Sequence, residues 1–356
     1  MNNSKNVSRY MFGRGAIKKL GDLLKERGEG YRVFFIDSFF KNSSLCNGLP
    51  IDKNDEVFFV DTSEEPKTTF INQYRDILVK KEKNKPNTII AIGGGSTLDT
   101  GKAVANLLTN PGNAEDYQGW DLVKNPAIYK IGIPTISGTG AEASRTCVMT
   151  NVKTGLKLGM NSDFTIYDQL ILDPDLTKTV PREQYFYTGM DTYIHSFESL
   201  NGRYRNAIGD AFAKQAIALC REVFLSDDMM SDENREKLMV ASYLGGCAIA
   251  NSFVGVVHPF SAGLSVVLGT HHCIANCITM NAMEEFYLKE FEEFFKMAEK
   301  QNVTIPKGIA SNLDIEMYQK LYDSTIIHKK PLLNALGDNF KEVLTFEKVT
   351  EIFKRM

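Results

Sequence analysis

The segment TIIAIGGGSTLDTGKAVANLL, residues 88–108, carries the clearest fold signal in the chain. Its apolar run at 88–92 predicts a buried strand, and the pattern at 98–108 predicts a helix. Gly93, Gly94, Gly95 and Ser96 join the two. Glycines let the backbone approach a ligand closely, and the unpaired N–H groups at a helix start favour an anion. The join therefore predicts a phosphate or pyrophosphate site. A plain tight turn is the alternative, because neither the G-x-G-x-x-G spacing nor a P-loop ending is present.

Apolar runs and helical patterns alternate through the first half of the chain. Strands are predicted at residues 31–36, 56–60 and 129–133, and a helix at 67–80. Such alternation favours a Rossmann-like, doubly wound and mostly parallel α/β sheet. Asp37 follows the first of these strands, and a small hydroxyl- and glycine-rich loop, 135–140, follows the last. Acids and small loops at strand ends are typical of a nucleotide crevice, with strand capping as the alternative role of Asp37.

From about residue 180 the strand signals fade and helical patterns follow one another. Helices are predicted at 184–200, 207–224, 234–250, 256–268, 282–300, 314–322 and 346–356. We therefore expect a dinucleotide-binding α/β domain over residues 1–180 and an all-α domain over 181–356, with the boundary near 178–182.

Composition places the chain among soluble globular proteins, with 43% hydrophobic residues, 24% charged residues and a net charge of −3. This charge gives no sign of a nucleic-acid-binding surface. The polar start of the chain lacks an apolar signal core, and no apolar run approaches the ~20 residues that span a bilayer. Six cysteines form no C-x-x-C pair, so we expect a reduced, cytoplasmic location. Cys273 and Cys277 have ligand-like spacing, but we interpret them as packing thiols.

A candidate metal site lies in the second half. Asp191 and His195 are four residues apart, so on a helix both side chains point from one face. Two more of the five histidines, His258 and His272, follow. A straight helix between these two would rise about 21 Å, so they can share an ion only if the chain bends. The bend is expected near Gly263 or Gly269. One carboxylate and three imidazoles suit Zn or Fe(II), whereas ordinary hydrogen bonding is the alternative for the first pair.

Four motifs, in this order, resemble the iron-containing (group III) alcohol dehydrogenases. They are GGGSTLD at 93–99, PTISGTGAE at 134–142, GMD with its histidine at 189–195, and the pair His258 and His272. The resemblance covers nearly the whole chain and implies a dehydroquinate synthase-like architecture that binds NAD and a divalent metal, Fe or Zn. The implied metal ligands are Asp191, His195, His258 and His272. The implied NAD-binding residues are Asp37 for the adenosine ribose, Gly94, Gly95 and Ser96 for the pyrophosphate, and Thr135, Thr139 and Lys157 for the nicotinamide region. Asp99 belongs to the motif with a role that is either binding or structural.

Three positions depart from the family pattern. Ala262 stands where a second histidine follows His258 by four residues, Ile136 replaces a threonine, and Cys273 replaces a glycine. In the family that second histidine lies near the nicotinamide, so we expect proton transfer to run differently here.

A closer resemblance is to the branch that oxidises 3-deoxy-D-manno-octulosonate (Kdo) at C8. It is carried by segments 117–122, 131–146, 157–163, 186–191 and 268–272. It implies metal-dependent oxidation of the C8 primary alcohol to an aldehyde, with either NAD or oxygen as the electron acceptor. An aminotransferase would then form 8-amino-Kdo for lipopolysaccharide biosynthesis. The wider family resemblance implies a homodimer.

No catalytic residue is defined beyond the metal set. His271 is a candidate for proton relay, with solvent exposure as the alternative. Arg145 is a candidate for the Kdo carboxylate, with an ion pair to an acid such as Glu142 as the alternative. Two alternatives to Kdo oxidation are kept. The protein could be an NAD-dependent dehydrogenase for another alcohol or polyol, or a non-catalytic protein that binds nucleotide and metal.

Overall fold

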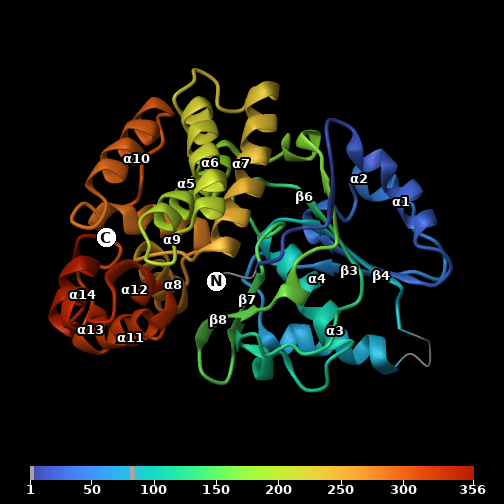
Figure 1. The fold of residues 1–356 in the computed structure, drawn as a ribbon, viewed down its shortest axis with the longest axis horizontal. Coiled ribbons are helices and arrows are strands. Elements are labelled where there is room, and N and C mark those ends of the chain that lie inside the picture. The colour runs from blue at the N-terminus through green and yellow to red at the C-terminus, as the bar shows by residue number, and fades with distance from the viewer. Residues whose placement is uncertain (1–3, 81–84) are drawn as a thin grey trace. The chain divides into compact units, whose positions relative to one another are not determined.

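The computed structural model describes residues 4–80 and 85–356 and divides into two compact units. One unit holds the chain up to residue 136 together with 141–179, and the other holds 137–140 and 180–356. The short segment 137–140 therefore belongs with the helical unit, although its neighbours in sequence belong with the sheet. Figure 1 shows the strands in the blue-to-green part of the chain and helices in the yellow-to-red part.

A six-stranded sheet forms the first unit, in the order β1-β9-β6-β4-β2-β3, and its strand pairs are parallel. Its strands are β1 (Arg9–Phe12), β2 (Arg32–Asp37), β3 (Glu56–Val60), β4 (Thr88–Gly93), β6 (Lys130–Pro134) and β9 (Gln169–Leu172). The inner strands β4 and β6 are buried along their whole length. Parallel strands covered on both faces appear as continuous apolar runs, so these were predictable, and the predicted parallel sheet is confirmed. The strands β1 and β9, four residues each, were not predicted, because they are too short to give a pattern.

Helices cover this sheet and connect its strands. They are η1 (Ala16–Lys19), α1 (Leu20–Glu26), η2 (Ser38–Phe40), α2 (Ser44–Asn47), α3 (Thr68–Lys80), α4 (Gly95–Leu107), η3 (Ala114–Tyr117), η4 (Asp163–Thr165) and η5 (Pro174–Thr177), where η denotes a 3-10 helix. The helix predicted to begin at residue 98 begins at Gly95, so the glycine turn is its first turn. A Cβ at Gly101 of α4 would lie 2.8 Å from the Cβ of Ala91, so glycine lets this helix pack closely on β4.

A small second sheet in the same unit was not predicted. It contains β5 (Gly119–Trp120), β8 (Leu156–Asn161) and β7 (Thr146–Asn151), with β7 and β8 antiparallel. The Asp99 carboxylate accepts a hydrogen bond from the backbone N–H of Val148 at 2.9 Å, and Lys102 Nζ donates to the carbonyl of Thr146 at 2.8 Å. These contacts hold the hairpin on α4 and give Asp99 a structural role.

The second unit is helical. Its elements are α5 (Arg182–Leu200), α6 (Ala207–Phe224), α7 (Asp232–Asn251), α8 (Val257–Leu268), α9 (His272–Thr279), η6 (Met280–Ala282), α10 (Leu288–Lys300), α11 (Ile315–Ile326), α12 (Lys329–Leu336), α13 (Phe340–Val343) and α14 (Phe346–Lys354). The helix predicted over 282–300 is wrong at its start, because Tyr287 turns into the core and its hydroxyl accepts the N–H of Val256. The short helices α9, α12 and α13 were not predicted. Within the described ranges, no helix is long and apolar enough to cross a membrane.

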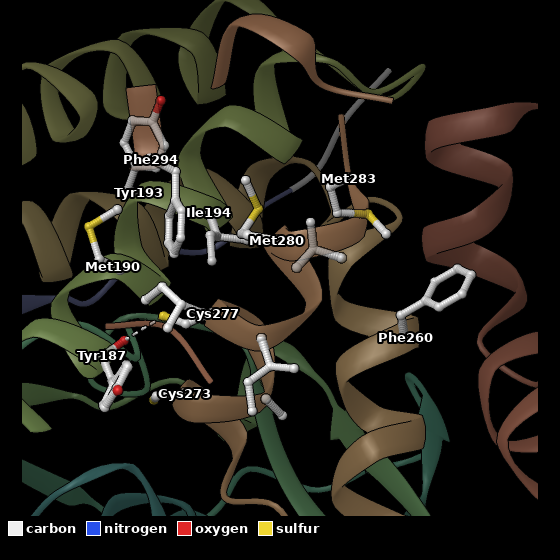
Figure 2. Packing of buried hydrophobic residues seen from close by; sticks show 14 of the residues in the cluster. Tyr187, Met190, Tyr193, Ile194, Phe260, Cys273, Cys277, Met280, Met283 and Phe294 are labelled. Carbon is white, nitrogen blue, oxygen red and sulfur yellow. Dashed lines mark hydrogen bonds between the residues drawn. The ribbon is translucent and has the colours of Figure 1, made fainter. Parts of the chain in front are cut away.

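The core of this unit surrounds α5, whose residues from Tyr185 to Ser199 are all buried. Figure 2 shows Met190, Tyr193 and Ile194 of α5 in one cluster with Met280 and Cys277. The Cys277 thiol donates to the Tyr187 carbonyl, as expected of a packing thiol. A helix buried on all sides leaves its polar side chains no access to water, so each must find a partner inside the protein.

Candidate metal and nucleotide sites

Asp191 and His195 lie on the same face of α5, as their spacing predicts, and both are buried. His195 Nε2 is 3.6 Å from Asp191 Oδ1. Both side chains are therefore oriented by one rigid helix before any ligand arrives.

The predicted bend between the other two histidines lies at Gly269. This residue has a φ of 68° and ends α8, and α9 begins three residues later at His272. Gly263 does not bend the chain, because it lies inside α8, where an added Cβ would meet Thr325 Oγ1 at 3.0 Å. The turn brings His258 Nε2 to 3.4 Å from Asp191 Oδ1 and His272 Nε2 to 3.8 Å from Oδ2.

Three of the four predicted ligands are placed so that they could share a cation. The donor atoms of Asp191, His195 and His258 all lie within 4.8 Å of one another, and the rings of His195 and His258 stack with centroids 4.6 Å apart. An ion about 2.0–2.1 Å from each nitrogen or oxygen places neighbouring ligand atoms about 3.3–3.4 Å apart in a tetrahedron. The separations of 3.4 and 3.6 Å from Asp191 Oδ1 to the nitrogens of His258 and His195 are close to this spacing.

Burial and mutual charge set the protonation of the site. Burial would raise the pKa of Asp191, but His195, His272 and His258 hold that pKa well below its usual range. Burial lowers the pKa of His195 to about 4, so its imidazole is neutral near pH 7. Burial also opposes charge on His258, but Glu198 and Asp191 raise its pKa to about 9. An anionic carboxylate and a neutral His195 are the forms that bind a metal.

Two further side chains at this site, Asn276 and Glu198, were missed by the sequence analysis, and a third, Cys273, was interpreted only as a packing thiol. Asn276 Nδ2 donates to Asp191 Oδ1 at 2.6 Å, and the Cys273 thiol donates to Oδ2 at 3.7 Å. Glu198 accepts from the ring of His258. Helical spacing could have indicated two of them, since Asn276 follows His272 by four residues and Glu198 follows His195 by three. Cys273 therefore contacts a predicted metal ligand, in addition to packing.

The glycine turn has the features of an anion site. Gly94 is the N-cap of α4, and no side chain caps this helix start. A Cβ at Gly93 would lie 2.6 Å from the Thr97 side chain, and one at Gly94 would lie 3.0 Å from Ile136. The backbone of Thr135 donates to the Gly93 carbonyl at 3.1 Å, which holds the ends of β4 and β6 together. The first N–H groups of α4, at Gly95 and Ser96, are thus the ones available to a phosphate.

Three other predicted NAD residues of the α/β unit have protein partners. The Asp37 carboxylate, at the end of β2, accepts from the Phe39 N–H at 3.0 Å and from the Thr62 hydroxyl. Burial raises its pKa. The nearly buried Lys157 of β8 forms an ion pair with Glu65 at 2.5 Å. Burial raises the pKa of Asp99 to about 6.

A cavity of about 160 Å³ adjoins Ser96. It is lined by acidic and aromatic side chains from the end of β3, the loop after it and α3, together with Ser96 and Thr100 of α4. Its acids include Asp61, Glu64 and Glu65. Carboxylates accept hydrogen bonds from hydroxyl and amide groups and repel phosphate, so this cavity suits an uncharged part of a ligand.

Thr139 belongs to the helical unit, because its loop is fixed to α5 and α7. Thr192 Oγ1 donates to the Gly138 carbonyl at 2.6 Å, and the Gly138 N–H donates to Ser242 Oγ at 2.8 Å. A Cβ at Gly138 would lie 1.7 Å from the Thr188 carbonyl oxygen. The loop therefore rests directly on the helix that carries Asp191.

Two residues were predicted as candidates for catalysis, His271 and Arg145. His271 is exposed as the N-cap of α9. Arg145 forms ion pairs with Asp121 and Asp163. This agrees with the alternative prediction of an ion pair, although the partners are these two acids and not Glu142. Because its guanidinium group already pairs with two carboxylates, Arg145 is a weaker candidate for binding a substrate carboxylate.

Two family models match the chain. Residues 7–174 match "Iron-containing alcohol dehydrogenase", and residues 185–323 match "Fe-containing alcohol dehydrogenase family, C-terminal". The NAD-dependent methanol dehydrogenase of Bacillus methanolicus is 30% identical over 379 residues, which cover 97% of each chain. The chain therefore belongs to the iron-containing alcohol dehydrogenase family, whose members use a divalent metal and NAD.

Solved structures agree on the fold. An alcohol dehydrogenase from Oenococcus oeni superposes with a TM-score of 0.86 at 25% identity over 99% of both chains. Sulfoacetaldehyde reductase from Bifidobacterium kashiwanohense, solved in complex with NAD+, gives a TM-score of 0.81 at 22% identity, covering 99% of this chain and 98% of the other. The likeness to the second protein concerns the fold alone.

Proposed function

We propose that this protein is an NAD-dependent, metal-dependent oxidoreductase that interconverts a primary alcohol and its aldehyde. The observation that carries the proposal is the convergence of Asp191, His195, His258 and His272, with the ligand atoms of the first three within 4.8 Å of one another. Membership of the iron-containing alcohol dehydrogenase family supports it.

A divalent ion bound by the proposed ligands would remain a Lewis acid. Asp191 contributes one negative charge and the imidazoles contribute none, so a divalent ion keeps net positive charge. Such an ion lowers the pKa of an alcohol and polarises a carbonyl. Asp191 is held in one orientation by Asn276 and Cys273, and the neighbouring histidines keep its carboxyl group anionic. These residues prepare the site without taking part in bond breaking.

The proposed nucleotide residues serve to bind and orient. The open N–H groups at the start of α4 receive the pyrophosphate, and Asp37 accepts hydrogen bonds from the adenosine ribose and repels a 2′-phosphate. Thr135, Thr139 and Lys157 are proposed for the nicotinamide region, and NAD bound there supplies the hydride acceptor. The pairing of Lys157 with Glu65 keeps that lysine in place and neutralises its charge.

For the substrate we propose the C8 hydroxyl of Kdo, on the resemblance of five segments to the Kdo-oxidising branch. An aminotransferase would consume the aldehyde, and the enzyme would act as a homodimer. The engaged Arg145 weakens one part of this substrate proposal, since the Kdo carboxylate needs another receptor. A dehydrogenase for a different small alcohol is the second candidate, and the relative named for methanol favours it.

The test is aldehyde formation by protein reloaded with Fe(II) or Zn, in air, with and without NAD, on Kdo and on a panel of simple alcohols. Aldehyde formation from Kdo supports Kdo as the substrate. Whether that reaction requires NAD shows whether NAD or oxygen is the electron acceptor. Aldehyde from simple alcohols alone, in step with NADH, favours the second candidate. If NAD and metal bind but no alcohol is oxidised, the enzyme proposal is wrong and a binding protein remains.

A further inference from the structure

Glu198 is a buried carboxylate on α5 that the sequence analysis gave no role. It follows Asp191 by two helical turns and His195 by one, and its side chain has no exposed surface. A buried carboxylate is costly unless it is fully hydrogen-bonded, so its partners indicate why it is there.

Both oxygens of this carboxylate meet the start of α8. Oε1 accepts from the backbone N–H of Val257 at 2.6 Å, and Oε2 pairs with Nδ1 of His258. Val257 is the first residue of α8, and its N–H has no partner within the helix. Glu198 therefore caps the helix and holds its one histidine at the same time.

This contact determines the tautomer of His258. A carboxylate can only accept, so Nδ1 carries a proton, and Nε2, which contacts Asn276 Nδ2 at 3.4 Å, is the nitrogen left for an ion beside Asp191, also 3.4 Å away. Carboxylates behind metal-binding imidazoles fix the ring and raise its basicity. His195 differs, because its Nδ1 has no hydrogen-bond partner within the described part of the chain. The contact is thus specific to His258.

The backbone beside Glu198 is shaped around it. A Cβ at Gly255 would lie 3.0 Å from Glu198 Oε1 and 2.4 Å from the hydroxyl of Tyr287. That hydroxyl accepts the N–H of Val256 at 3.1 Å. The segment entering α8 is therefore held by two side chains, one of which is the carboxylate.

We propose that Glu198 is a positioning residue that presets the ring and tautomer of His258 for the metal. This inference rests on the proposed metal site. His258 lies 60 residues after Glu198 in the sequence. Through Glu198, the orientation of His258 depends on α5, the helix that also carries Asp191 and His195.

The test is Glu198→Gln, measured as the dissociation constant for Zn by competition with a chromophoric chelator. A Gln amide can keep its oxygen on the Val257 N–H, and its NH₂ group then faces His258 Nδ1. The ring must rotate or move its proton to Nε2, which blocks the ligand atom. We expect Zn affinity to fall about 10–100-fold.

Glu293→Gln is the matched control. Glu293 accepts hydrogen bonds from Tyr193 of α5 and from Arg221 but contacts none of the proposed ligands. Its variant should bind Zn within about twofold of wild type, about 0.4 kcal/mol. Wild-type affinity in Glu198→Gln, or equal losses in both variants, would overturn the inference.

Imidazole ¹⁵N chemical shifts of metal-loaded wild type give a readout that needs no variant. Protonated Nδ1 and metal-bound Nε2 at His258 are expected, and the opposite arrangement contradicts the proposal. If wild type binds no Zn at all, the metal site itself is wrong, which is a separate outcome.

Discussion

Replacing Gly138 by alanine should dislodge the loop that rests on the metal helix. The residue has a φ of +146°, and an added Cβ would lie 1.7 Å from the Thr188 carbonyl oxygen and 2.2 Å from its carbon. Both are backbone atoms of a buried helix and cannot rotate away. The loop must therefore retreat by roughly 1.3 Å to reach the 3.0 Å that Cβ atoms tolerate.

A retreat of this size breaks the two short hydrogen bonds of Gly138, to Thr192 and to Ser242. A broken buried hydrogen bond costs about 1–3 kcal/mol when its partner is left unpaired. We therefore expect a loss of about 3 kcal/mol beyond the backbone strain, or about 6–12 °C in the melting temperature of a unit of this size.

The assay is calorimetric melting of Gly138→Ala beside two control variants. Gly13 has a φ of +143° and Gly269 a φ of +68°, and neither would bring a Cβ within 4 Å of another atom. Both control variants report backbone strain without a clash, Gly13→Ala in the α/β unit and Gly269→Ala in the same helical unit as Gly138. If Gly138→Ala melts within about 2 °C of both controls, the close packing of this loop on α5 is refuted.

The remaining predictions concern the two proposed sites. Asp191→Asn should reduce bound metal, measured by elemental analysis after dialysis, from about one ion per chain to below about 0.1, and retained metal would contradict the ligand assignment. Asp37→Ser should raise the ratio of kcat/KM with NADP to that with NAD by about tenfold or more, because it removes the carboxylate that repels a 2′-phosphate. The raised pKa of Asp99, about 6, means that folding favours its protonated form. Its contribution is present below pH 3.8 and lost as the pH rises through 6. Relative to Asp99→Asn, wild type should lose up to about 3 kcal/mol in urea unfolding between about pH 4 and pH 7, and parallel curves would refute this.

Local patterns were sufficient for much of the fold. Continuous apolar runs identified the buried strands β2, β4 and β6, because a parallel strand covered on both faces has no polar side to interrupt the run. The run at β3 was recognised as well, although this strand lies at the sheet edge and is only partly buried. Strands β1 and β9 were not predicted, because four residues give no clear pattern and β1 pairs with a strand far away in the sequence. The hairpin of β7 and β8 was also missed, although its two strands are neighbours in the sequence.

The same division applies to the candidate metal site. Four-residue spacing alone places Asp191 and His195 on one face of a helix, because helix geometry fixes that relation locally. Which glycine turns the chain between His258 and His272 depends on packing, since Gly263 lies against Thr325 inside α8 whereas Gly269 is free to adopt a positive φ.

The sequence by itself determined the class of fold, the glycine turn at the start of α4 and the shared helix face of two proposed metal ligands, Asp191 and His195. Only the tertiary structure decided that Glu198 lies behind His258, that Asn276 holds Asp191, and that the loop of Thr139 joins the helical unit. The physical reason is that helical and strand periodicity act over a few residues. Contacts between side chains 60 or more positions apart exist only after the core has packed.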